Sequence, residues 1–268
     1  MPWGPERRRA AVTLSFDNLG EVSDLARGRW PDDAPLGEHV SVTRALPRII
    51  ELLAVLGLRA TFFVEGCNTR LYPDALADLV AARHEVAYHG WRHEDWAALD
   101  PVRERELLER GRHAMDELGI ALRGLRPPGG RLTDASLGLL AELGFTYCSP
   151  AGEGAGTRGG LAVLPFRWDL IDAFHVLPRF AALRGSAEPT SPAVFAARLR
   201  EALDDAVRRG AHLSLLFHPF LLVEEERMAV LRDTLRAVCD ADAWRATYAE
   251  LAAAGVPADD LRLDRTPA

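Results

Sequence analysis

Two histidines, His89 and His93, are separated by three residues and directly follow a short strand-like run at residues 85–88. Two imidazoles at this spacing, held where a strand ends, can bind one divalent cation from the same side. The same spacing also arises by chance, and histidines often only cap or pack, so the pair alone does not establish a metal site. A metal-assisted reaction is the leading prediction, and it depends on partners elsewhere in the chain.

Further polar residues follow other apolar runs. They are Asp17 and Asn18 after residues 11–16, Arg126 to Gly129 after residues 121–125, Asp169 and Asp172 after residues 161–166, and His218 after residues 213–217. In a parallel barrel, functional side chains gather where strands end and their loops begin. Each cluster has an ordinary alternative, because Asp17 is compatible with a turn, Arg126 with a salt bridge and His218 with the end of a strand. Together with the histidine pair they make five polar clusters at the ends of apolar runs, which are hard to attribute to packing alone.

The apolar runs alternate with amphipathic segments. Strands are predicted at residues 11–16, 59–64, 85–88, 121–125, 145–148, 161–166 and 212–217, and helices at residues 42–56, 73–82, 101–118, 133–143, 191–209 and, in an alanine-rich extension, 224–254. Strands separated by such helices imply parallel pairing through right-handed crossovers, and about seven units favour a barrel. We predict an α/β fold with one domain over residues 1–268. Two flexible loops, residues 152–160 and 184–192, could border a substrate cleft.

The composition excludes several classes of protein. Of the 268 residues, 48% are hydrophobic and 26% are charged, and the formal net charge is −7. An acidic chain whose arginines are scattered among acids has no electrostatic reason to bind nucleic acid. All 32 basic residues are arginine, which excludes a lysine Schiff base, a pyridoxal phosphate anchor and a phosphate-loop lysine.

Three cysteines, Cys67, Cys148 and Cys239, are far apart in the sequence, which predicts packed thiols and neither a disulfide framework nor a thiolate zinc site. The first nine residues are polar and bear arginines, without the apolar core of a signal peptide. No later stretch reaches about 18 continuous apolar residues. We therefore expect a cytoplasmic protein with no membrane partner.

The polar clusters form an ordered series of five motifs: Ser15-Phe16-Asp17-Asn18, His89-x-x-x-His93, Arg126-Pro127-Pro128-Gly129, Asp169-x-x-Asp172 and Leu215-Leu216-Phe217-His218. In order and spacing, this series resembles the motifs of the polysaccharide deacetylase superfamily, carbohydrate esterase family four, over residues 11–220. Each motif is weak alone, but the ordered series is specific. The resemblance implies a distorted (β/α)7 barrel and a metal-dependent hydrolase that removes acyl groups, typically N-acetyl groups of amino sugars.

The resemblance also implies a role for each motif residue. His89 and His93 would hold a divalent metal, with zinc the first choice. Asp17 would be the general base, and Arg126 would orient it through a bidentate contact. His218 would be the general acid, and Asp172, or less favourably Asp169, would pair with it. These roles agree with the chemistry, because attack of water on an amide needs a polarising cation, a base for the water proton and an acid for the departing amine. The oxyanion would be shared by the metal and a backbone N–H near Gly129.

Several positions depart from the family pattern. Asn18 stands where the family usually has a second aspartate, and a neutral amide oxygen is a poorer ligand for a hard or borderline cation. Glu21 could supply the missing carboxylate, although an exposed acid in a loop is an equally good interpretation. Gly129 replaces the aromatic residue of the third motif, and Ala173-Phe174 stands where a tryptophan usually follows the fourth, so the walls of a sugar subsite are altered.

The predicted substrate is a small molecule or oligosaccharide that contains an amino sugar. Trp91 and Trp168 could stack on a pyranose ring, although tryptophans are more commonly core residues. The run His89-Gly90-Trp91-Arg92-His93-Glu94 is also similar to an allantoinase-like branch of the superfamily, so a cyclic amide or ester hydrolase remains an alternative. A second alternative, a catalytically lapsed barrel that binds carbohydrate, is favoured only by Asn18. The sequence leaves the oligomeric state open.

Overall fold

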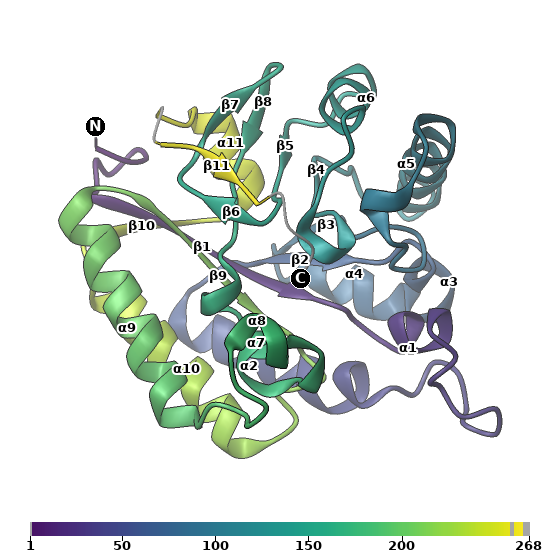
Figure 1. The fold of residues 1–268 in the computed structure, drawn as a ribbon, viewed down its shortest axis with the longest axis horizontal. Helices are drawn as coiled ribbons and strands as arrows, with labels where there is room; N and C mark the ends of the chain where they lie inside the picture. The colour runs from purple at the N-terminus through teal and green to yellow at the C-terminus, as the bar shows by residue number, and fades with distance from the viewer. Residues whose placement is uncertain (1, 258–259, 265–268) are drawn as a thin grey trace.

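The structure is a computed structural model that describes residues 2–257 and 260–264. Its centre is a curled sheet with the parallel strands β1 (Ala10–Asp17), β2 (Thr61–Val64), β3 (Glu85–Tyr88), β4 (Gly124–Leu125), β5 (Tyr147–Cys148), β8 (Leu161–Val163) and β9 (His212–Phe217) (Figure 1). In space they follow the order β9, β1, β2, β3, β4, β5 and β8. A parallel bridge between Ile171 and Leu216 brings the chain after β8 against β9. This arrangement confirms the predicted α/β fold of the distorted barrel type.

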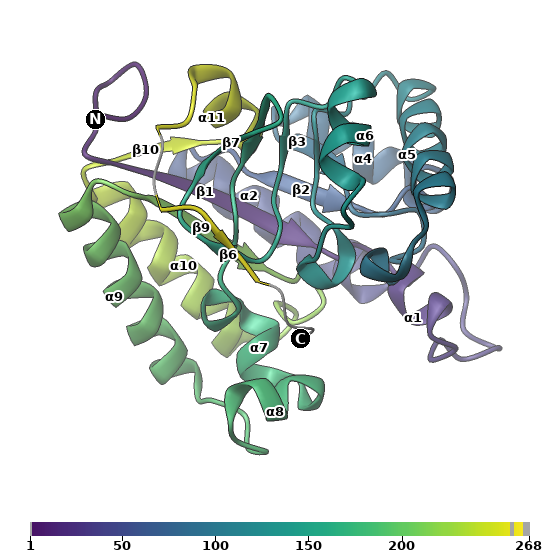
Figure 2. The same ribbon diagram turned by 45° about the horizontal axis from the view of Figure 1, so that its top comes forward.

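The strands are buried because helices cover the outer side of the sheet, as is usual for parallel sheets. All eight residues of β1 are buried, and Phe16 stacks on Phe62 of β2 with ring centroids 4.9 Å apart. The covering helices are α2 (Leu46–Leu56), α4 (Pro73–Ala81), α5 (Pro101–Asp116), α6 (Ser136–Glu142), α9 (Pro192–Arg209) and α10 (Glu225–Asp240). Figures 1 and 2 show α9 and α10 side by side along one flank.

Local sequence signals set the limits of the longer helices. The Asp100 side chain accepts hydrogen bonds from the backbone N–H groups of Val102 and Arg103, and Pro101 occupies the first turn of α5. The α9 helix ends at Gly210, whose φ of 71° lies in the left-handed region that favours glycine. The predicted positions of these two helices are confirmed to within a few residues.

Short elements occupy the loops between the strands and the longer helices. They are α1 (Val22–Ala26), α3 (Asn68–Leu71), α7 (Asp172–Val176), α8 (Ala181–Arg184), a π-helical turn at Ser41–Ala45, and 3₁₀ turns at Trp96–Ala98, Pro128–Gly130, Trp168–Leu170 and Pro178–Phe180. Several of them directly follow the carboxyl ends of strands. They therefore form the walls of the site described below.

Two predictions about the later part of the chain are wrong. The helical extension over residues 224–254 is interrupted by strand β10 (Ala243–Ala246), which pairs with the first half of β1 before α11 (Tyr248–Ala254) begins. The glycine-rich loop at residues 152–160 contains β6 (Gly152–Glu153), which pairs with β11 (Arg262–Leu263), and β7 (Gly156–Arg158), which pairs with β8. Pairing with a neighbouring strand has overridden the local composition in both places.

The three cysteines are unpaired, as predicted, with Cys148 buried and Cys67 and Cys239 half-buried. None of the helices in the described ranges is both long and apolar enough to cross a membrane.

Candidate active site

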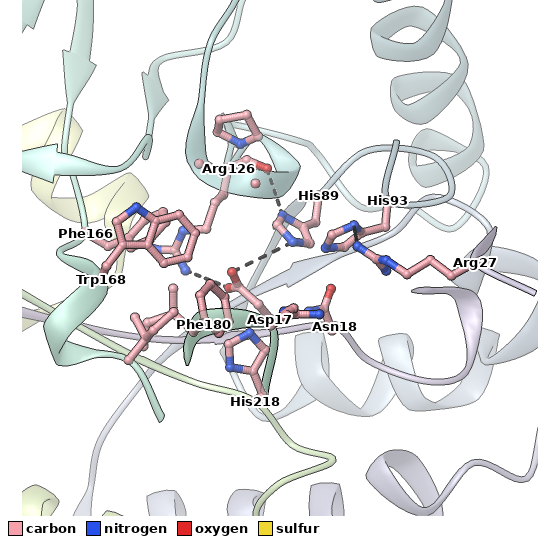
Figure 3. A pocket seen from close by; sticks show the side chains of 16 residues that line it. Asp17, Asn18, Arg27, His89, His93, Arg126, Phe166, Trp168, Phe180 and His218 are labelled. Atoms are coloured by element: carbon pink, nitrogen blue, oxygen red, sulfur yellow. Dashed lines mark hydrogen bonds and ion pairs between the residues drawn. The ribbon is translucent and has the colours of Figure 1, made fainter. Parts of the chain in front are cut away.

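A pocket of about 210 Å³ opens at the carboxyl ends of the parallel strands (Figure 3). It brings together most of the predicted site residues: Asp17 and Asn18 from the end of β1, His89 and His93 after β3, Arg126 and Gly129 after β4, Trp168 after β8 and His218 after β9. Five different segments of the sequence therefore reach one cavity through the order of the strands.

Asp17 is held in the pocket by a buried guanidinium. The Nη1 atom of Arg126 donates to Asp17 Oδ1 at 2.6 Å and to Ser15 Oγ at 2.8 Å. Its Nε and Nη2 atoms donate elsewhere, to Ser149 Oγ at 3.2 and 2.9 Å and to the Tyr248 hydroxyl at 2.7 Å. The predicted bidentate contact is therefore wrong, because only one nitrogen of Arg126 reaches the carboxylate. This geometry leaves Asp17 Oδ2 without a guanidinium partner.

His89 presents one nitrogen to the same space as Asp17. Its Nδ1–H donates to the carbonyl oxygen of Arg126 at 2.8 Å, and its Nε2 lies 3.9 Å from Asp17 Oδ2. Burial lowers the pKa of His89 to about 4, although the nearby Asp17 charge opposes the shift. The ring is neutral near pH 7, with the lone pair of Nε2 available, which is the form that binds a metal.

His93 is also uncharged near neutral pH. Burial first, and then its neighbours His89 and Arg27, lower the pKa of His93 well below its ordinary value. The two histidine rings are nearly perpendicular, with centroids 5.0 Å apart. However, Arg27 Nη2 donates to His93 Nδ1 at 3.0 Å, which places the proton of the neutral ring on Nε2. A cation held at Nε2 would require the proton on Nδ1 instead and would therefore compete with the Arg27 guanidinium for this imidazole.

Asn18 contributes an unsatisfied acceptor. Its Oδ1 atom is buried and has no hydrogen-bond partner, and the residue is held at a φ of 59° in the left-handed region. His93 has a similar φ of 62°. Strained backbone at non-glycine residues is commonly retained at functional sites. An amide oxygen without a hydrogen-bond partner, beside two neutral imidazoles, fits the donor set of a divalent cation, although this set contains no carboxylate.

Glu21 does not supply that carboxylate. It is fully buried away from the pocket, where Oε1 accepts from the backbone N–H of Gly37 at 2.7 Å and Oε2 from the hydroxyl of Tyr72. The prediction of Glu21 as a metal ligand is therefore wrong in this structure, because its oxygens are already used by a loop. Within residues 2–257 and 260–264, no three Asp, Glu, His or Cys side chains are grouped so that they could hold a metal. Asn18 is thus the third donor that the pocket offers.

His218 is paired with Asp172, as predicted. Asp172 Oδ1 accepts from His218 Nδ1 at 2.6 Å, and Oδ2 accepts from the backbone N–H of His218 at 2.8 Å. Asp169, the less favoured candidate, instead binds Arg167 and Arg198. The pairing fixes the His218 ring with Nδ1 as donor and leaves Nε2 for proton exchange.

The walls of the pocket only partly match the predicted substrate residues. Trp168 lines it, edge to face with Phe166 and near Phe180, and in Figure 3 these rings lie on the opposite side of Asp17 from His93 and Arg27. Gly129, at a φ of 74°, has open space where a side chain would project. Trp91 does not line the pocket, since its buried ring packs beneath Arg110, 3.7 Å from the guanidinium carbon. The prediction of Trp91 as a substrate residue is wrong for that reason.

Among the residues that line the pocket, the sequence did not indicate Arg27, Arg179 and Phe180. They come from short helical turns after β1 and β8, where no periodic pattern marks the chain. Arg27 and Arg179 could not be distinguished from the many other arginines by type or spacing. His175, which lies just beyond the fourth motif, is outside this pocket, and its Nε2–H donates to the carbonyl oxygen of Asp169 at 2.9 Å.

Comparisons with known proteins show which family the chain resembles. The model of the polysaccharide deacetylase family matches residues 7–148, just over half of the chain. Among solved structures, a Mycobacterium smegmatis protein described as a "putative polysaccharide deacetylase" is 28% identical, with a TM-score of 0.83 and coverage of 94% of this chain and 93% of that one. PuuE allantoinase has a TM-score of 0.76 over 94% and 91% of the two chains, but at 19% identity this likeness concerns the fold alone.

Curated relatives match over shorter stretches. Chitin deacetylase 1 of Saccharomyces cerevisiae is 31% identical over 159 residues, which are 50% of this chain and 53% of the yeast protein. Across the curated relatives, the aligned region spans between 22% and 53% of the relative's length. From the family match over residues 7–148 and the fold that it shares with solved members, we conclude that the chain belongs to the polysaccharide deacetylase family.

Proposed function

We propose that this protein is a metal-dependent hydrolase that removes an N-acetyl or related acyl group from an amino sugar or a sugar-containing small molecule. The observation that carries the proposal is the pairing of two proton-transfer groups in one pocket. Asp17 has one carboxylate oxygen fixed by Arg126, and His218 has one ring nitrogen fixed by Asp172. The deacetylase names of the curated relatives support an amide substrate.

The cofactor in this proposal is a divalent cation, with zinc as the first choice. His89, His93 and Asn18 would hold it, since they provide two neutral imidazoles and an orphaned amide oxygen. When bound, such a cation supplies Lewis acidity, which polarises an acyl carbonyl and lowers the pKa of water.

The protein's own residues would move the protons. Asp17 Oδ2, which has no guanidinium partner, accepts a proton from the attacking water, while the Arg126 charge keeps the carboxylate in place. His218 Nε2 then delivers a proton to the departing amine nitrogen, and Asp172 holds the imidazole in the required orientation. Each proton-transfer group of this kind contributes about 10²- to 10⁴-fold to a rate.

The test is acetate release from a panel of N-acetylated amino sugars by zinc-loaded wild-type protein and the Asp17→Asn variant. We expect the variant to lose at least about 100-fold in kcat, because an amide cannot accept the water proton. Since Asp17→Asn leaves the buried Arg126 without its counter-charge, a thermal melt must show that the variant is folded. His218→Gln, which leaves that ion pair intact, is the second variant and should also lose activity.

Two results would contradict the proposal. One is undiminished acetate release by folded Asp17→Asn protein. The other is turnover of cyclic amides with none of any acetylated sugar, which would select the alternative hydrolase.

A further inference from the structure

Two arginines in the pocket lack carboxylate partners. Arg27 and Arg179 both line the cavity that contains Asp17 and His93, and both are exposed to solvent at its mouth. Arg27 donates only to uncharged groups, the backbone and hydroxyl oxygens of Ser23 and the Nδ1 of His93. Arg179 makes no ion pair in the described ranges, and its guanidinium carbon lies 4.9 Å from the ring centroid of Phe180.

The nearest acidic residues do not neutralise these charges. Asp24 is already paired with Arg29, at 2.7 Å between Asp24 Oδ1 and Arg29 Nη2. Glu65 is fully buried, and burial raises its pKa well above the ordinary range, which disfavours its charged form. Burial and the repulsion of Arg27 and Arg29 lower the pKa of Arg179 to about 10, so it stays charged near neutral pH. The cluster therefore carries an excess of positive charge.

This local charge is opposite in sign to that of the whole protein. The chain has a formal net charge of −7, and arginines elsewhere in the chain, such as Arg126 and Arg198, have carboxylate partners. Concentrating like charges without partners costs stability, and such charges at a cleft attract an oppositely charged ligand. A bound anion would offset the unfavourable repulsion between the two arginines.

The shape of the site extends past Arg179. A second cavity of about 380 Å³ adjoins the pocket, shares Asn18 and Arg179 with it, and continues to Arg29 and His39. The pocket of about 210 Å³ is smaller than the about 300–1,000 Å³ of sites that enclose whole small molecules. A substrate whose acyl group lies beside Asp17 therefore has room to extend past Arg179 into the second cavity.

We propose that Arg27 and Arg179 form an anion subsite, so that the preferred substrate is an acylated amino sugar that carries a phosphate or carboxylate group. This inference rests on the proposed function for the acyl group and the sugar, and it adds the charge of the substrate. Guanidinium groups suit both anions, because they form charge-assisted and often bidentate hydrogen bonds with phosphate and carboxylate oxygens.

The test measures binding of sugars that cannot be turned over. Glucosamine, glucosamine 1-phosphate, glucosamine 6-phosphate and muramic acid are titrated into wild-type protein by calorimetry. We expect at least one anionic sugar to bind about tenfold or more tightly than glucosamine, as hydrogen bonds between charged groups typically allow. Comparison of the two glucosamine phosphates with muramic acid shows whether the protein prefers a phosphate or a carboxylate.

Three variants locate the effect. The preference for the anionic sugar should fall about threefold in Arg179→Gln and vanish in the double variant Arg27→Gln/Arg179→Gln. It should persist in Arg44→Gln, which makes the same change in net charge at an exposed arginine that lines neither cavity. Equal binding of all four sugars by the wild type, or a preference that survives the double variant, overturns the subsite.

The same data separate this inference from the proposed function. Acetate release from acetylated sugars without any preference for an anion contradicts the subsite alone. A preference for anionic sugars in a protein that hydrolyses no acetylated sugar contradicts the proposed hydrolase alone.

Discussion

The donor set of the pocket depends on one side-chain atom, the Oδ1 of Asn18. This oxygen is buried without a partner beside His89 and His93, and it stands where the family pattern has a carboxylate. A neutral amide gives a cation no charge compensation, and Arg27 competes for His93. We therefore expect weak metal binding in the wild-type protein.

Changing Asn18→Asp should strengthen zinc binding by about 10- to 100-fold, since a carboxylate adds a full negative charge to two neutral imidazoles. Competition with a chromophoric chelator measures the affinity. The gain should disappear when the same substitution is made in a His89→Gln background. An unchanged affinity in the single variant would mean that Asn18 does not face the cation.

The pair formed by His218 and Asp172 gives a second expectation at this scale. In Asp172→Asn, the amide no longer provides a charged acceptor for His218 Nδ1–H, so kcat should fall by about 10²- to 10⁴-fold. The control is Asp169→Asn, which changes the other aspartate of the motif, whose partners are Arg167 and Arg198. Steady-state acetate release measures both, and equal losses in the two variants would count against a specific role for Asp172.

The structure brings most residues of the motif series together in one pocket, because types such as His and Asp at the ends of strands carry information about position. It failed at Glu21 and Trp91, which lie close to motif residues in sequence but turn into the protein. Chain proximity does not determine the direction of a side chain. Arg27 and Arg179 were missed because their positions depend on loop conformations that have no periodic signature.

At the scale of elements, the contact between helix α5 and strand β3 holds the chain that leads to His89. Tyr88, the last residue of β3, donates its hydroxyl to the carbonyl oxygen of Leu107 at 2.7 Å, and its ring lies directly against Gly111 of α5. A Cβ atom at Gly111 would collide with the ring. Glycine at this position therefore allows the close approach of the helix.

We expect Gly111→Ala to reduce the free energy of unfolding by about 1–2 kcal/mol, since overpacking costs more than the gain of about 1 kcal/mol in helix propensity. The matched control is Gly138→Ala in α6, where the added methyl meets no atom within 4 Å, and which should raise stability by about 0.5–1 kcal/mol. Urea unfolding measures the free energy of unfolding of both variants. Stabilisation by Gly111→Ala would show that α5 can move away without cost.

Most elements were predicted from periodicity, but β10 was not. Its four residues, Ala243-Trp244-Arg245-Ala246, lie in alanine-rich sequence that favours helix, and only pairing with β1 makes them a strand. A local signal is present directly after β10, because Thr247 and Glu250 form a capping box that begins α11. A helix start at that point already implies a break in the tail.

At the scale of the whole molecule, buried neutral histidines make stability depend on pH. Burial, and to a lesser degree Arg59, lowers the pKa of His84 to about 4, and its Nδ1 accepts from the backbone N–H of Ala60 at 3.3 Å. The unfolded chain binds a proton near the ordinary histidine value of about 6.5, so between about pH 6.5 and 4 it holds more protons than the folded state. The contribution of the neutral His84 ring to stability is therefore fully present above this pH window and is lost as the pH falls through it.

The free energy of unfolding should fall between pH 6.5 and 4, with His84 contributing on the order of 2 kcal/mol by the lower limit. Urea titrations at a series of pH values measure the slope. The variant His84→Gln, which cannot be protonated, should show a smaller slope over the same window. An identical slope in wild type and variant would contradict the assignment to His84.

The proposed mechanism requires that distant segments of the chain meet around one cation beside a base. The most direct measurement is acetate release from an N-acetylated amino sugar by chelator-treated protein as zinc is added back. We predict that turnover is lost on chelation, returns as zinc is titrated back to saturation, and does not return in His89→Gln. Full turnover by metal-stripped protein, or restoration in His89→Gln, would contradict it.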